Sequence, residues 1–142
     1  MTGSVATPKT GYLIIAHGAL AFEMLQTLEF IAGKQTGFKA VAIDHAVDMD
    51  KAREIITAAI DEIMTDKGVI ALTDLFGGAP SNIAMSLMDE KKLEIVAGVN
   101  LPILIHAAMM DESLTLKEKA QKLRDYGRNN IFVASEVLSG GK

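Results

Sequence analysis

The sequence predicts a single doubly wound α/β domain, with a mainly parallel central sheet and helices on both of its faces. Five short runs of aliphatic or β-branched residues alternate with segments in which apolar residues recur at helical spacing. Strands that alternate with helices indicate right-handed crossovers between parallel strands. The first strand of such a sheet lies near its centre and neighbours the third. We therefore expect the strand order 2-1-3-4 plus a C-terminal strand.

The predicted strands are short and almost wholly apolar, as is typical of strands that are buried on both faces of a sheet. They cover residues 12–16, 39–43, 69–73, 93–97 and 131–135. After the first of them, Leu20, Met24, Leu28 and Ile31 recur at helical spacing, and the pattern stops near Gly33. The other expected helices lie at residues 50–66, directly after Gly77-Gly78, at 103–110 and at 114–127.

Composition limits both the class of protein and the kinds of site it can hold. Of the 142 residues, 49% are apolar and 23% are charged, which is typical of a globular domain. The net charge of −4 argues against nucleic-acid binding, because such binding needs a basic face. The absence of cysteine excludes disulfides, thiolate metal ligands and cysteine nucleophiles, and it fits a reducing compartment.

One domain accounts for nearly all of the chain. We expect residues 1–10 to be a flexible lead-in without the apolar segment of a signal peptide, and residues 139–142 to be a flexible tail. Residues 11–138 then form the domain, since no linker or repeat divides them. No run approaches the roughly 18–20 apolar residues that cross a bilayer. We therefore expect a soluble, cytoplasmic protein.

Two of the predicted strands end in side chains that can act together. His17 follows the first apolar run and Asp74 follows the third. Ligands bind at the carboxyl ends of parallel strands, and the first and third strands are expected to be neighbours. His17 and Asp74 should therefore face one crevice, with Gly18 allowing a sharp turn beside the imidazole.

The residues after Asp74 are typical of an anion site. Gly77, Gly78 and Ala79 bring backbone N–H groups to the start of a helix, where negative charge is favoured. An imidazole can accept a phosphoryl group at neutral pH, and a carboxylate on its other nitrogen stabilises the developing positive charge. This segment lacks the lysine of a nucleotide-binding loop, so ATP is not the expected donor. No cofactor is predicted, and the spacing of His and carboxylate residues favours no metal site.

Three segments of the chain resemble the mannose-type enzyme IIA component of the bacterial phosphoenolpyruvate-dependent sugar phosphotransferase system (PTS). They are residues 14–18, 73–82 and 96–102, and the resemblance covers about 12–137. It implies that His17 accepts phosphate from the phosphocarrier protein HPr and passes it to an enzyme IIB, that Asp74 orients the imidazole, and that the chain forms a homodimer. A membrane would be involved only through the sugar permease. Many family members have Ser or Thr where this chain has Ala79, so a hydroxyl contact to the phosphate is absent here.

Several further residues near these motifs have two interpretations each. Ser81, Asn82 and Asn100 are candidates for the rim of the site, although Asn100 could instead close a strand-to-helix turn. His45 follows the second predicted strand and is expected in an exposed loop. His106 lies in an apolar segment and is expected in the core or at an interface.

Two other functions remain open for such a domain. It could be a free-standing regulatory switch whose phosphorylation state a partner protein reads. It could also be the phosphoryl-transfer subunit of a dihydroxyacetone kinase, but Leu75-Phe76-Gly77-Gly78 differs from the motif usual there. A receiver domain or a flavodoxin is disfavoured, because neither the acidic pair nor the Ser/Thr-rich phosphate loop follows the first strand.

Overall fold

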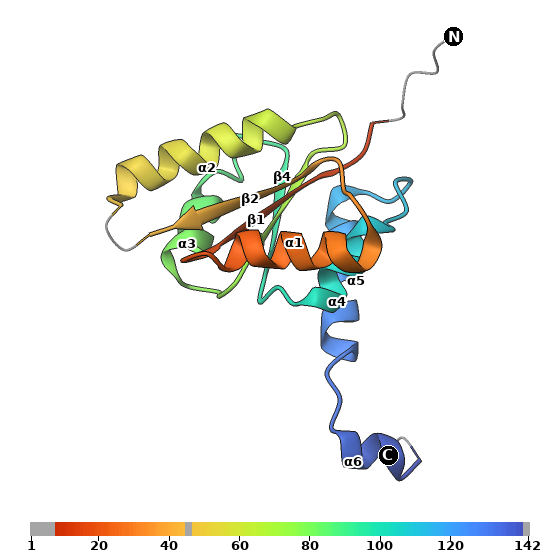
Figure 1. Ribbon diagram of the computed structural model, residues 1–142. Coiled ribbons are helices and arrows are strands. Elements are labelled where there is room, and N and C mark those ends of the chain that lie inside the picture. The colour runs from red at the N-terminus through yellow and green to blue at the C-terminus, as the bar shows by residue number, and fades with distance from the viewer. Residues whose placement is uncertain (1–7, 45–46, 141–142) are drawn as a thin grey trace.

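Four parallel strands form the centre of the computed structural model, which describes residues 8–44 and 47–140 (Figure 1). Their order across the sheet, numbered along the chain, confirms the predicted order 2-1-3-4. Residues 1–7 of the expected lead-in, His45 and residues 141–142 lie outside the described residues. The strands are β1 (Gly11–His17), β2 (Phe38–Ile43), β3 (Val69–Thr73) and β4 (Leu93–Ala97).

Helices cover both faces of this sheet, as predicted. Successive β1 residues face opposite sides, because side chains alternate along a strand. Tyr12 and Ile14 belong to the core on one face, and Leu13 and Ile15 to the core on the other. The first core lies beneath α1 (Leu20–Ala32), α4 (Leu101–Ala108) and α5 (Leu116–Asn129), and the second beneath α2 (Met49–Ile63) and α3 (Ala79–Ser86). Within the described ranges, no helix has the length and apolar character needed to cross a membrane. A short sixth helix, α6 (Ala134–Leu138), follows α5.

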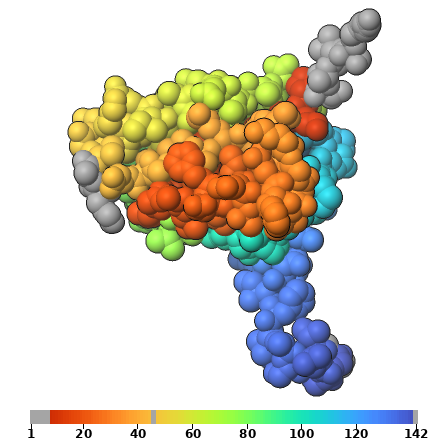
Figure 2. All heavy atoms as spheres, viewed as in Figure 1, coloured from red at the N-terminus to blue at the C-terminus, as the bar shows by residue number. Residues whose placement is uncertain are grey.

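The predicted C-terminal strand at 131–135 is wrong for this chain. Residues 131–133 have no regular structure, and α6 begins at Ala134. Ile131, Phe132 and Val133 have strong strand propensity, but a strand also needs a neighbour to pair with. Residues 131–140 are exposed and project away from the body of the molecule (Figure 2). We call them the C-terminal arm.

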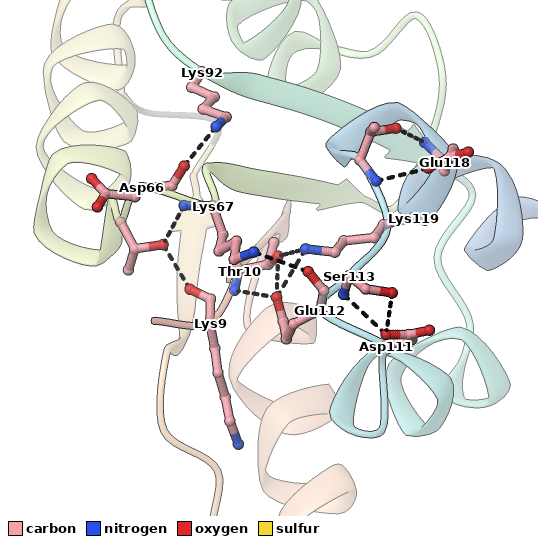
Figure 3. Close-up of polar contacts among 12 residues, drawn as sticks. Lys9, Thr10, Asp66, Lys67, Lys92, Asp111, Glu112, Ser113, Glu118 and Lys119 are labelled. Atoms are coloured by element: carbon pink, nitrogen blue, oxygen red, sulfur yellow. Dashed lines mark hydrogen bonds and ion pairs between the residues drawn. The ribbon is translucent and has the colours of Figure 1, made fainter. Parts of the chain in front are cut away.

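A buried ion pair ties the start of β1 to α5 at the end of the sheet opposite His17. The Lys119 side chain is only 1% exposed, and its Nζ lies 2.8 Å from Glu112 Oε1 and 2.6 Å from Thr10 Oγ1. The Thr10 N–H and hydroxyl also donate to Glu112 Oε1 (Figure 3). Burial alone would raise the pKa of Glu112, but the hydrogen bonds from Lys119 and Thr10 and the charge of Lys119 outweigh it and lower that pKa.

Replacing Glu112 with glutamine should therefore destabilise the fold in a pH-dependent way. The change leaves Lys119 buried without its counter-charge, and we expect a loss of about 2 kcal/mol at neutral pH, less than for a fully buried pair. Because the folded pKa of Glu112 lies below its ordinary 4.5, the stabilisation is complete above that value and is lost as the pH falls through the folded pKa. Urea unfolding of both proteins at neutral and acidic pH measures this.

The exposed Glu54, which lies 3.9 Å from Lys51, supplies the matched control. Glu54→Gln should change the free energy of unfolding by less than about 0.5 kcal/mol at either pH. Equal losses in the two variants, or a Glu112→Gln loss that persists in acid, would contradict the stabilising role of this ion pair.

Candidate active site

Adjacent strands bring His17 and Asp74 together at the carboxyl end of the sheet. His17 is the last residue of β1, and Asp74 directly follows the last residue of β3, which pairs with β1. Gly18 then turns the chain away with φ +59, a conformation that favours glycine. Its N–H donates to Ile43 O at 3.4 Å, which extends the pairing between β1 and β2.

One carboxylate holds both the backbone and the ring of His17. Asp74 Oδ2 lies 2.8 Å from His17 Nδ1 and accepts the His17 backbone N–H at 3.0 Å. Its other oxygen, Oδ1, accepts the Leu75 N–H at 2.8 Å. The His17 side chain is 37% exposed and that of Asp74 is 11% exposed. The imidazole is therefore held in a fixed orientation and remains accessible to a partner.

The pKa of Asp74 is lowered from its ordinary 3.8. Burial alone would raise this pKa, but the hydrogen bonds from the His17 N–H and ring, the electrostatic influence of that ring and the hydrogen bond from the Leu75 N–H outweigh it. Asp74 is therefore ionised at neutral pH. An ionised carboxylate accepts hydrogen bonds, so the Nδ1 side of the ring donates to Asp74 and Nε2 is the ring nitrogen on the far side from this contact.

The loop before α3 lies against the edge of the His17 ring. A Cβ atom added to Gly78 would be 3.3 Å from Cε1 and 3.8 Å from Nε2 of His17, so the loop backbone closely approaches the ring. Gly77 has φ +88, and its N–H donates to Ser81 Oγ at 2.9 Å. Ala79 is the first residue of α3, and its position places an amide at the helix N-terminus, where anions are favoured.

The predicted site residues divide into two groups. His17, Asp74 and Gly78 meet, with Ala79 next in the chain. The N–H groups of Gly18 and Gly77 are instead engaged within the fold, so a role for them in binding phosphate stays a prediction.

The three candidate rim residues hold backbone in place. Ser81 is fully buried, and Asn82 Nδ2 donates to Gly77 O at 3.2 Å. Asn100 Oδ1 caps α4 by accepting the Ile103 N–H at 3.0 Å, and Asn100 Nδ2 donates to Gly127 O at 3.4 Å. Of the two interpretations of Asn100, these contacts favour the strand-to-helix turn.

The other described histidine lies outside this cluster. The His106 ring stacks on Tyr126 with centroids 4.4 Å apart, which fits the expected packing role. Among residues 8–44 and 47–140, no three His, Cys, Asp or Glu side chains come together in a way that could hold a metal ion.

Sequence reasoning missed two apolar residues beside the site. Leu75 and Phe76, between Asp74 and Gly77, are 58% and 77% exposed. Large apolar side chains exposed next to a functional group are typical of protein docking sites. Their place inside the motif was the available signal, but periodicity does not show which way loop side chains point.

This arrangement suits transfer of a phosphoryl group onto nitrogen. In such a transfer a ring nitrogen of His17 would attack, and Asp74 would stabilise the positive charge that develops on the ring. The N-terminus of α3 favours the negative charge of the arriving group. Phosphoryl transfer depends mainly on such positioning and neutralisation.

Comparisons of the sequence with known proteins point to one family. A family model described as the PTS system fructose IIA component matches residues 11–124. The fructose-specific EIIA component of Bacillus subtilis (strain 168) is 29% identical over 127 residues, which are 89% of this chain and 87% of that protein. The mannose-specific EIIAB component of Escherichia coli (strain K12) is 29% identical over 121 residues, which are 84% of this chain but only 38% of that protein.

Solved structures of phosphotransferase-system IIA proteins are also similar to this chain. The phosphotransferase system component EIIA from Streptococcus agalactiae matches with a TM-score of 0.81 and 25% identity, covering 89% of this chain and 98% of that one. The mannose/sorbose-specific IIA subunit from Enterococcus faecalis matches with a TM-score of 0.80 and 27% identity. The match covers 88% of this chain and 94% of that one.

Proposed function

The chain belongs to the family of PTS system fructose IIA components, and from this premise we propose that it is a phosphohistidine carrier. His17 accepts a phosphoryl group from phosphorylated HPr and passes it to an enzyme IIB that serves sugar uptake. The observation that carries this proposal is the 2.8 Å contact between His17 Nδ1 and Asp74 Oδ2. Such a carrier would work in the cytoplasm and reach the membrane only through its permease.

The proposed transfer forms one bond and breaks one. Nε2 of His17 attacks phosphorus, the bond between phosphorus and the donor breaks, and the donor keeps that electron pair. The Nδ1 proton stays hydrogen-bonded to Asp74 throughout, so the imidazolium-like ring is neutralised by the carboxylate. Onward transfer to the enzyme IIB reverses these steps, and neither transfer requires a cofactor.

Passage of phosphate to an enzyme IIB separates this proposal from the regulatory alternative. The protein is phosphorylated with radiolabelled phosphoenolpyruvate, enzyme I and HPr, separated from them, and mixed with enzyme IIB proteins from its own host. We expect the label to move to at least one of them. A label that stays on His17 with every one would favour a regulatory switch.

We propose that the homodimer implied by the family resemblance forms through the C-terminal arm. β4 is an edge strand, and a groove of about 520 Å³ lies between it and α5. Glu94–Gly98 of β4 and the loop after it line this groove, together with Arg124 and Arg128 of α5. The arm is apolar and carries Glu136, so it complements a groove with cationic side chains. We propose that two copies exchange arms, each arm lying in the groove beside β4 of the other.

Removal of the arm tests this dimer. A chain ending after Asn130 loses the exposed apolar residues of the arm but none of the two cores. We expect the full chain to be a dimer and the truncated chain to be a folded monomer in size-exclusion chromatography with light scattering. A monomeric full chain, or a truncated chain that still dimerises, would contradict arm exchange.

A further inference from the structure

The hydroxyl of Ser81 is enclosed within the active-site loop. Ser81 lies in the first turn of α3 and is fully buried, although the residues around His17 are partly open. A buried hydroxyl needs hydrogen-bond partners, because leaving it unpaired is costly. Both of its partners are backbone groups of the two residues that precede α3.

The Ser81 hydroxyl joins two consecutive residues of this loop. It accepts the Gly77 N–H at 2.9 Å and donates to Gly78 O at 3.1 Å. A hydroxyl has one proton to donate, and these contacts use it. Because Gly77 adopts φ +88, the turn is a conformation that the surrounding bonds must hold in place.

These bonds decide what the loop presents to His17. Gly78 is the residue whose backbone lies against the ring near Nε2. The Gly77 N–H points to Ser81, so this amide is not among those that the start of α3 offers to an anion. Loss of the Ser81 hydroxyl would release the Gly77 N–H and free the turn to change shape beside the reacting nitrogen.

We propose that Ser81 is a positioning residue for phosphoryl transfer: its buried hydroxyl holds the Gly77-Gly78 turn against the His17 ring and withholds the Gly77 N–H from the phosphoryl group. The inference rests on the proposed function of His17. Ser81 does not touch the reacting atoms, and it acts through the backbone of Gly77 and Gly78.

The first test uses the unphosphorylated protein. In Ser81→Ala, hydrogen exchange of the Gly77 amide followed by NMR should accelerate about tenfold, since one hydrogen bond is lost. Amides of β1 and β3 should keep their exchange rates. Ser86→Ala is the matched control, because Ser86 lies at the other end of α3 and donates to Ile83 O. An unchanged Gly77 rate in Ser81→Ala would overturn the proposal.

The second test measures the equilibrium constant for phosphoryl transfer from phosphorylated HPr to His17. In Ser81→Ala the equilibrium constant should fall about tenfold, while the KM for phosphorylated HPr stays unchanged. Ser81→Thr keeps a hydroxyl and should restore part of the loss, and Ser86→Ala should match the wild type. Equal equilibrium constants for Ser81→Ala and wild type would overturn the positioning role. Absence of phosphate uptake by the wild type would instead overturn the proposed function, and Gly77 exchange would still show whether Ser81 holds the turn.

Discussion

Replacing His17 with glutamine should abolish phosphoryl uptake and leave the fold intact. Glutamine is polar and of similar length, but its amide nitrogen has no lone pair with which to attack phosphorus. The His17 side chain is 37% exposed, so we expect a stability change within about 1 kcal/mol. Uptake is measured with radiolabelled phosphoenolpyruvate, enzyme I and HPr, and stability by urea unfolding.

His106→Gln provides the matched control, because His106 is the other histidine that the structure describes and it stacks on Tyr126 away from the site. This variant should take up phosphate like the wild type. Labelling of His17→Gln, or loss of labelling in folded His106→Gln, would remove His17 from the role proposed for it.

Replacing Asp74 with asparagine should slow phosphoryl transfer roughly 100- to 1,000-fold. The wild-type carboxylate accepts three N–H groups, from the His17 backbone, the His17 ring and Leu75. An asparagine has the same shape, but it lacks the charge and has one acceptor oxygen in place of two. It therefore favours the wrong tautomer of His17 and leaves positive charge on the ring without a counter-charge.

The rate is measured by rapid quench with phosphorylated HPr. Asp111→Asn is the control, since Asp111 also accepts a backbone N–H, from Ser113, but precedes Glu112, which contacts Thr10 at the start of β1. We expect Asp111→Asn to transfer at the wild-type rate. A wild-type rate in Asp74→Asn would show that Asp74 is a structural cap and takes no part in the transfer.

The strand order and the pairing of His17 with Asp74 could be predicted because both follow from general rules. Buried parallel strands are continuous apolar runs, and residues that directly follow neighbouring strands must meet at one edge of the sheet. The helix after Gly78 and α5 could also be predicted, because apolar residues recur at helical spacing in both segments. Periodicity predicted the helices better than it predicted their buried faces: Leu28 of α1 is buried, but Leu20 and Ile31 of the same predicted stripe are exposed.

The details of the anion loop could not be read from the sequence. A Gly-Gly pair before a helix predicts backbone N–H groups that could bind an anion. The sequence does not show which of these groups are already hydrogen-bonded within the fold. In the structure, the Ser81 hydroxyl accepts the Gly77 N–H, and the backbone oxygen of Ile43 accepts the Gly18 N–H. The prediction of a C-terminal strand was wrong for another reason. Residues 131–133 have strand propensity, but propensity does not show whether a neighbouring strand is available for pairing.

The most direct test of the central claim is the intact mass of the wild-type protein after incubation with phosphoenolpyruvate, enzyme I and HPr. We predict the added mass of one phosphoryl group, which mild acid removes and base preserves, as expected for phosphate on the imidazole of His17. No added mass, or a phosphoryl group that survives acid, would contradict the phosphohistidine carrier.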